Sequence, residues 1–223
     1  MVVQQIHLDG HKYQGADVLL FHRYHGEDTI VAFLQHNQRG PYVNVAGGRC
    51  ESKHRDLEDT AAVELYEESR KSIFIASDVL RDMTARGSFV DYPGDNHHSL
   101  PGRRRCFVAR VPHVSTTIYN ENKRMLDSVA PSHRLAPYLE TQAMVRIPVA
   151  ALEASLKTGD SGHGRTVAGF YVSRFTVTAY LRAKTANLVK NAYNLSRVSY
   201  EQKENDNRDV TGLHVGRIDT YRF

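Results

Sequence analysis

Glu64, Glu67 and Glu68 form a closely spaced group of acids that follows the glycine pair Gly47-Gly48 in the sequence. On a helix, residues three and four apart lie on one face, so these carboxylates are expected to point outward together, within a sector of roughly 100°. Apolar residues fill the adjoining strip of the same helix, which can pack against a core. They are Ala61, Ala62 and Leu65.

Like charges at this spacing destabilise an isolated helix by about a few tenths of a kcal/mol per pair. A divalent cation removes that repulsion. Oxygen ligands suit Mg²⁺ or Mn²⁺, and Mg²⁺ completes its coordination shell with water and substrate phosphates. The acids are therefore candidate metal ligands, and the alternative is that they form only a solvated helix face.

The order of these residues resembles the Nudix box, which would span residues 47–70 here. The family pattern is a glycine, five residues, a glutamate, seven residues, and then Arg-Glu-hydrophobic-any-Glu-Glu-any-Gly-hydrophobic. The matching core is Gly47-Gly48 followed by Glu64-Leu65-Tyr66-Glu67-Glu68. Glu51 falls where many members of the family also carry a glutamate.

The box is degenerate in four respects. Its first glutamate is missing, since His54 or Arg55 stands at that position, and its loop is one residue longer than the family spacing. Val63 replaces the arginine that braces the helix in the family, and Arg70 replaces the glycine that ends it. The pair of adjacent glutamates is retained without these supports.

The resemblance implies an α/β fold, namely a Nudix-type α/β/α sandwich with a mixed β-sheet. It implies a hydrolase-like domain over residues 1–192, and leaves 193–223 as a polar C-terminal extension of unknown role. The implied activity is that of a metal-dependent pyrophosphohydrolase. Its substrate would be a nucleoside diphosphate linked to another moiety, as in a nucleotide, a dinucleotide, a sugar nucleotide or a capped RNA.

Two other interpretations stay open. The departures from the family pattern also suit a catalytically impaired Nudix-fold protein that binds nucleotides or RNA without turnover. Alternatively, the box is accidental and the chain is a basic α/β domain that binds nucleic acid, with an affinity that falls steeply with salt.

The resemblance also implies roles for individual residues. The carbonyl of Gly48 and the side chains of Glu64, Glu67 and Glu68 would bind Mg²⁺ or Mn²⁺, with Glu64 and Glu68 in the catalytic positions. Some family members place a further base or ligand downstream of the box, and Glu140, just before a predicted strand, is the best candidate. The alternative for Glu140 is an exposed acid in a loop.

Basic side chains near these acids are candidate ligands for substrate phosphates, which arginine binds through two parallel hydrogen bonds. Arg103 and Arg105 alternate onto one face of a predicted strand, and Arg49 and Lys53 lie in the box loop. We therefore expect a phosphorylated, nucleotide-type partner, with RNA as a possibility. The alternative is a solvated basic edge.

Regular elements are predicted on both sides of the box. A helix is expected to begin after Asp56, which can cap it, and to run at least to Ser69. Apolar spacing predicts a long amphipathic helix over 172–192. Shorter helices are predicted at 77–83 and 121–130, and strands at 16–21, 29–34, 42–46, 87–92, 104–111 and 143–148, with a hairpin at 25–28 between the first two.

The composition describes an ordinary globular chain of 223 residues, with 41% hydrophobic and 24% charged residues. No apolar stretch is long enough to span a membrane, and the sequence shows no secretory signal. Cys50 and Cys106 are the only cysteines, which fits two buried thiols in a reducing cytosol and predicts a cytoplasmic protein. A net charge of +4 suits a polyanionic partner without requiring one.

Overall fold

The computed structural model describes residues 4–38, 40–94, 102–112, 114–129, 136–157, 164–195, 197–201 and 215–219. The sequence also predicts a loop over 93–103, between two strands, and part of this loop lies outside the described residues. Within them, no helix is long and apolar enough to cross a membrane.

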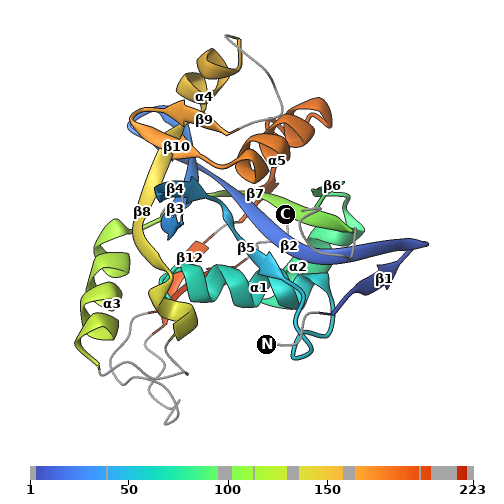
Figure 1. Ribbon diagram of the computed structural model, residues 1–223, viewed down its shortest axis with the longest axis horizontal. Coiled ribbons are helices and arrows are strands. Elements are labelled where there is room, and N and C mark those ends of the chain that lie inside the picture. The colour runs from blue at the N-terminus through green and yellow to red at the C-terminus, as the bar shows by residue number, and fades with distance from the viewer. Residues whose placement is uncertain are drawn as a thin grey trace.

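A mixed sheet forms the centre of the structure (Figure 1). Strand β2 lies in its middle, parallel to β7 on one side and antiparallel to β3 on the other. The strand order is β11-β7-β2-β3-β4-β10-β9, with β1 and β5 on β2, β6 on β7 and β8 on β3. The strands are β1 (Ile6–Leu8), β2 (His11–Tyr24), β3 (Glu27–Asn37), β4 (Gly40–Asn44), β5 (Ala46–Arg49), β6 (Phe89–Pro93), β7 (Arg103–Val111), β8 (Thr141–Pro148), β9 (Arg165–Val167), β10 (Phe170–Val172) and β11 (Tyr193–Asn194).

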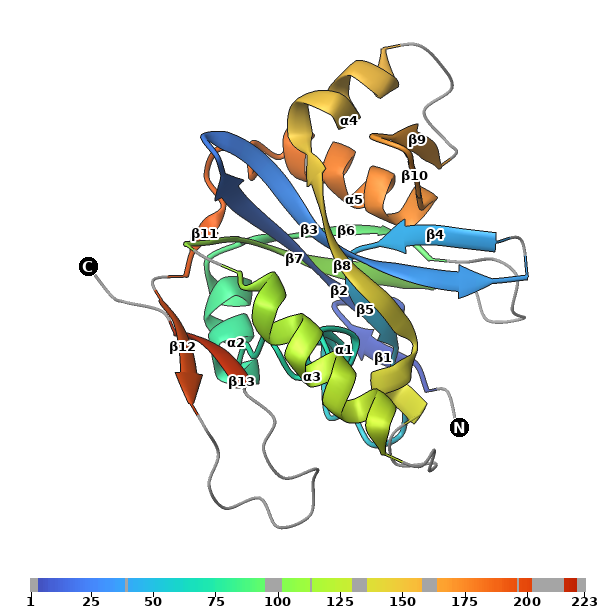
Figure 2. The same cartoon turned by 90° about the vertical axis from the view of Figure 1, so that its left-hand side faces the viewer.

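Helices cover both faces of the sheet, which confirms the predicted α/β/α architecture with a mixed sheet. In Figure 2, α1, α2 and α3 lie on one side, and α4 and α5 on the other. The bounds are α1 (Leu57–Glu68), α2 (Ser77–Ala85), α3 (Thr116–Ser128), α4 (Val149–Leu156) and α5 (Arg174–Thr185), with a 3₁₀ helix, η1, at Ala136–Leu139.

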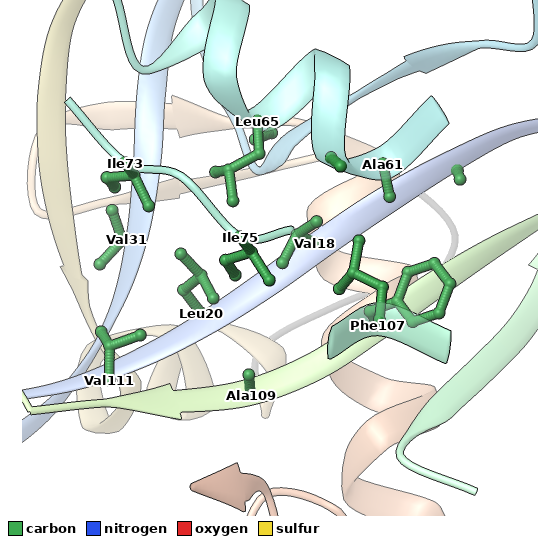
Figure 3. Close-up of a cluster of buried hydrophobic side chains, with 14 of the residues drawn as sticks. Val18, Leu20, Val31, Ala61, Leu65, Ile73, Ile75, Phe107, Ala109 and Val111 are labelled. Atoms are coloured by element: carbon green, nitrogen blue, oxygen red, sulfur yellow. The ribbon is translucent and has the colours of Figure 1, made fainter. Parts of the chain in front are cut away.

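Alternation along β2 divides the apolar residues between two cores. Val18 and Leu20 face α1, whereas Leu19 and Phe21 face α5. Figure 3 shows the first of these cores, in which Leu65 of α1 lies on the side of the sheet that carries Val18 and Leu20 of β2. Burial of the predicted apolar strip therefore fixes how α1 is rotated against the sheet.

The first hairpin forms where the sequence predicts one, but its turn is shorter than the predicted connection at 25–28, because β3 begins at Glu27. Tyr24 pairs with Glu27, so the turn contains only His25 and Gly26. Both residues have positive φ angles, 48° and 83°, as a tight hairpin turn that follows the twist of its strands requires.

The last long helix is shorter than predicted. Val172 belongs to β10, and α5 begins only at Arg174, after Ser173 caps it by accepting from the Thr176 N–H at 3.2 Å. At the other end, Asn187 adopts a left-handed conformation with φ of 59°, and the Leu188 N–H donates to the Ala183 carbonyl. This arrangement ends a helix, and apolar spacing does not reveal it.

Residues just beyond position 192 also contribute to the sheet and to its core. Tyr193 and Asn194 form β11, which pairs in parallel with β7. Leu195 is buried in the core beneath α1 and α2. Beyond it, β12 (Arg197–Glu201) and β13 (Val215–Asp219) pair with each other in a separate antiparallel ribbon.

Arg70 ends α1 in the backbone conformation that a glycine would favour. Its φ is 52°, its N–H donates to the Glu67 carbonyl, and the Lys71 N–H donates to the Tyr66 carbonyl. These bonds form the usual cap of a helix C-terminus, in which a left-handed residue follows the last turn. Arg70 therefore takes the place of the missing glycine in backbone geometry as well as in sequence.

We expect Arg70→Gly to destabilise the protein, although it removes left-handed strain of about 1–2 kcal/mol. The Arg70 guanidinium is buried; its Nε donates to the Thr141 carbonyl at 2.9 Å and its Nη1 to Asp127 at 2.8 Å. Loss of hydrogen bonds from a charged group costs about 1.5–3 kcal/mol each, which exceeds the relief of strain. Chemical denaturation measures the net loss, and Asn187→Gly, at the exposed left-handed residue that follows α5, controls for a glycine in this conformation. A more stable variant would show that the guanidinium contributes little.

Candidate functional site

The N-terminus of α1 sets the direction of the helix that carries the acids. Asp56 accepts from the Asp59 N–H at 2.7 Å, which is the predicted cap. Arg81 of α2 pairs with the other oxygen of Asp56 at 2.8 Å. The last residue of the helix is Glu68, with Ser69 as its C-cap. Helix α1 thus points its C-terminal half at the glycine pair.

Gly47 and Gly48 lie in β5, between β2 and the acids of α1. A Cβ on Gly47 would lie 2.1 Å from Asp17 Oδ1. A Cβ on Gly48 would lie 2.2 Å from the carboxylate carbon of Glu64. Only glycines leave room for these two carboxylates, so the pair is needed for the close approach of side chains from β2 and α1.

Glu68 differs from the prediction that the three acids point outward together. It is only 4% exposed; its Oε2 accepts from the Gly47 N–H at 3.0 Å and its Oε1 from the Gln35 amide. Burial raises the pKa of Glu68 well above its usual range, and the Glu64 charge raises it further. Glu68 therefore holds the glycine strand to the helix, because its carboxylate reaches across to β5.

The pKa of Glu64 is raised into the range of neutral pH. Burial, followed by the charge of Glu67, raises the pKa of Glu64 to about 8, while Arg104 opposes the shift. Burial also raises the pKa of Glu67, against the attraction of Lys53. Carboxyl groups with raised pKa values gather at functional sites more often than elsewhere.

Lys53 joins two acids of the cluster. Its Nζ lies 3.3 Å from Glu51 and 3.4 Å from Glu67, and half of its side chain is exposed. Exposed ion pairs of this length each contribute about 0–1 kcal/mol to stability. Another cation can therefore readily displace this ammonium group from the acids. Lys53 thus neutralises part of the repulsion between the acids.

Glu140 follows η1 and is electrostatically part of the same cluster. Its charge raises the pKa of Glu64, Glu67 and Glu68. Partial burial, together with the charge of Glu51, raises the pKa of Glu140 itself. A long-range partner from a different part of the chain therefore adds to the acids of the box.

The predicted phosphate ligands lie in different environments. Arg103, Arg49 and Lys53 are exposed. Arg105 is not: it is 4% exposed, pairs with Asp91 at 2.9 Å and stacks on Phe89 with its Cζ 3.8 Å from the ring centroid. Its buried guanidinium, which donates to Asp91 and to the Tyr13 hydroxyl, argues against the prediction that Arg105 binds substrate.

Arg104 lies between Arg103 and Arg105 in β7, and its place at the site was not predicted from the sequence. It donates to both oxygens of Asp17 and, through Nη2, to the Gly48 carbonyl at 2.9 Å. Strand alternation directed attention to its neighbours instead. The available signal was Asp17, a carboxylate inside the apolar run of β2, since a buried charge needs a buried partner.

The donor chemistry of the cluster suits Mg²⁺ or Mn²⁺, because carboxylates are hard oxygen ligands whose mutual repulsion a cation relieves. As they lie, however, no three His, Cys, Asp or Glu side chains among the described residues are grouped to hold an ion. Lys53 bridges two of the acids and Arg104 binds the Gly48 carbonyl. An ion bound here would therefore displace Lys53 and draw the carboxylates together.

A pocket of about 490 Å³ opens beside Glu67 on the outer face of α1. Val63, where the family carries arginine, forms part of its wall. Three aromatic rings contribute to this wall, with Tyr66 edge-on to the other two at centroid distances of 5.8 and 6.3 Å. These rings are Tyr66, Phe74 and Tyr138. The pocket places flat apolar surface next to the acid cluster.

The described chain is thus an α/β/α sandwich whose mixed sheet presents a glycine pair to a cluster of glutamates. No family model matches the sequence, and no curated protein matches it.

Several solved structures resemble the fold, at low sequence identity. A C. elegans Ap4A hydrolase in a binary complex is 11% identical, with 80% of this chain and 98% of that chain covered and a TM-score of 0.45. The NUDIX domain of Shewanella oneidensis NrtR complexed with ADP ribose is 9% identical, with coverage of 78% and 88% and a TM-score of 0.46. A NUDIX hydrolase from Alicyclobacillus acidocaldarius is 12% identical, with coverage of 82% and 97% and a TM-score of 0.45.

Proposed function

We propose that this protein is a Nudix-type pyrophosphohydrolase, dependent on Mg²⁺ or Mn²⁺, that cleaves a nucleoside diphosphate linked to another moiety. The observation that carries the proposal is that Glu64 and Glu68 of α1 reach the glycine pair, and that acids from two further segments raise the pKa values of these two carboxyl groups. The box loop contributes Glu51, α1 contributes Glu64, Glu67 and Glu68, and the segment after η1 contributes Glu140. Such a cluster of like charges lowers the stability of the fold unless a cation offsets their repulsion, and clusters of this kind are found most often at functional sites.

The side chains of the cluster have separable roles in this proposal. Glu64 and Glu67 bind the cation, and Glu68 positions the glycine strand through Gly47. A bound divalent cation neutralises phosphate oxygens and increases the acidity of water. Glu64 or Glu140 would then accept the proton of the attacking water, since the pKa of each is raised and a more basic carboxylate is a better proton acceptor.

The substrate side of the proposal rests on the exposed cations and the aromatic pocket. Arg49, Lys53 and Arg103 bind phosphate oxygens that the cation leaves free. The pocket beside Glu67 accepts a base or another flat group, because aromatic rings stack on any base. A nucleotide, a dinucleotide, a sugar nucleotide and a capped RNA all meet these requirements.

The alternative function is a nucleotide- or RNA-binding protein of the same fold without turnover. It is favoured by one specific observation, namely that the positive charges of Lys53 and Arg104 already lie against the cluster. In that case the cations of the chain itself would take over the charge balance that a metal ion gives an enzyme.

We expect the full chain to release nucleoside monophosphate from at least one member of a panel of nucleoside diphosphate derivatives and capped RNA. Cleavage should require Mg²⁺ or Mn²⁺ and stop with a chelator, because the acids cannot bind phosphate without a cation. Product analysis by chromatography measures it. Nucleotide binding with no cleavage under any of these conditions would contradict the hydrolase and support the binding protein.

A further inference from the structure

Arg104 reaches the glycine pair by crossing β2 at Gly15. A Cβ on Gly15 would lie 2.6 Å from Arg104 Nη1, 2.8 Å from its Cζ and 2.3 Å from the Gly48 carbonyl oxygen. Any other residue at position 15 would therefore block the path of the side chain. The sequence keeps a glycine in the middle of a long strand, where glycine is unfavourable, at the place where the arginine passes.

The Arg104 guanidinium forms a buried ion pair with Asp17. Its Nε donates to Asp17 Oδ2 at 2.9 Å and its Nη2 to Asp17 Oδ1 at 2.5 Å, which is the two-bond geometry of a strong arginine–carboxylate pair. The Tyr92 hydroxyl donates to the same carboxylate. The side chain of Arg104 is 11% exposed and that of Asp17 is 2% exposed. The pair is therefore a built-in part of the fold.

Arg104 Nη2 also donates to two backbone carbonyls, to that of Gly48 at 2.9 Å and to that of Ala16 at 3.5 Å. The resemblance to the Nudix box assigns the Gly48 carbonyl to a metal ion. A guanidinium remains charged at all pH values that proteins tolerate and repels a divalent cation at contact distance. Glu64 lies against the same glycine, and the charge of Arg104 opposes the rise in the pKa of Glu64.

We infer that Arg104 takes the place of a metal ion at the Gly48 carbonyl, so that any divalent cation is bound by the carboxylates without this carbonyl. The inference rests on the proposed function for the identity of the ion, and on the contacts of Arg104 for its position. It makes Arg104 a positioning residue, which orients Gly48 and the Glu64 carboxylate from inside the protein.

The test compares Mn²⁺ binding by the full chain and by an Asp17→Asn/Arg104→Gln variant, measured by electron paramagnetic resonance. The two substitutions cancel in net charge and remove both members of the buried ion pair, so that neither charge is left unpaired. Freeing the carbonyl should increase Mn²⁺ affinity at least 10-fold or add a second bound ion. An Asp28→Asn/Arg110→Gln variant removes a matched ion pair of the same sheet, at 2.7 Å, and should bind Mn²⁺ as the wild type does.

Unchanged stoichiometry and affinity in the folded Asp17→Asn/Arg104→Gln variant would overturn the inference and leave the hydrolase intact. Mn²⁺ binding by this variant alone, with none by the wild type, would support the inference and contradict the hydrolase.

A measurement on the wild type removes any dependence on the folding of the variant. In protein labelled with ¹⁵N-arginine, the Arg104 Nε–H should be protected from solvent exchange because Asp17 accepts it in a buried site. Saturating Mg²⁺ should leave the position and protection of this signal unchanged. Loss of protection on adding Mg²⁺ would mean that the ion displaces the guanidinium, and would overturn the inference.

Discussion

Glu64→Gln is expected to lower turnover at least roughly 100-fold while making the metal-free protein more stable. Turnover falls because the variant lacks a charged oxygen ligand and a proton acceptor at the cation site. The neutral amide nearly keeps the shape of the carboxylate over Gly48. Opposite effects on activity and stability distinguish a functional acid from a structural one.

The gain in stability depends on pH in a direction that the pKa shift sets. Glu64 has a pKa of about 8 in the folded protein against an ordinary value of 4.5, so the folded state holds a proton that the unfolded state has lost. The contribution of Glu64 is fully present below pH 4.5 and is lost as the pH rises to about 8. One proton gives a slope of at most about 1.4 kcal/mol per pH unit.

Denaturation of the metal-free protein at pH 7 and pH 8, followed by activity assays, checks this prediction. Histidine usually titrates below this range of pH. The dependence of stability on pH between 7 and 8 therefore comes mainly from Glu64 and the other acids of the cluster whose pKa values are raised. Glu64→Gln should flatten the slope, and added Mg²⁺ should do so in the wild type. Glu27→Gln, at an exposed acid of the β2–β3 hairpin, is the control and should change neither property. A Glu64→Gln variant with full turnover would remove Glu64 from the mechanism.

Glu68 shows why sequence position alone does not separate these roles. The spacing places it with Glu64 and Glu67, and a helix wheel predicts three equivalent outward acids. In the structure, both of its oxygens accept hydrogen bonds, from Gln35 and from Gly47. The burial of Glu68 depends on β3 and β5, and the sequence does not specify how these strands are placed against the C-terminus of α1.

The sequence predicts those structural elements that depend only on residues close together in the chain. The cap at Asp56 and the turn at His25 follow from residue types over a few positions, and the structure confirms both. The apolar strip of α1 follows from helical periodicity and is buried as expected. The left-handed conformation of Arg70 was not predictable, because tertiary contacts impose on it a conformation that an arginine does not favour. Asn187 is of a residue type that tolerates this conformation, but apolar spacing alone did not mark it as the end of the helix.

The arginines of β7 show the same difference between features set by neighbouring residues and features set by tertiary contacts. Alternation correctly places Arg103 and Arg105 on one face and Arg104 on the other, but it does not indicate which face meets the glycine pair. That depends on the parallel pairing of β7 with β2, which aligns Arg104 with Gly15 and Cys106 with Asp17. Contacts between segments this far apart in sequence come from topology, which periodicity does not specify.

Asp17→Asn is expected to destabilise the protein by about 3–5 kcal/mol, because it leaves the buried guanidinium of Arg104 without its counter-charge. For a domain of this size, such a loss lowers the melting temperature by roughly 10 °C. The variant also disturbs Tyr92, whose hydroxyl donates to Asp17 in the wild type. Calorimetry and urea denaturation measure the two quantities.

Asp28→Asn supplies the matched comparison, because Asp28 pairs with Arg110 of the same strand β7 at 2.7 Å but is 41% exposed. Solvent screens such a pair, so its loss should cost at most about 1 kcal/mol. Adding Arg104→Gln to Asp17→Asn should restore much of the stability, since it removes the unpaired charge as well. Equal losses from Asp17→Asn and Asp28→Asn, or a further loss in the double variant, would show that the Asp17–Arg104 pair does not govern the stability of this part of the sheet.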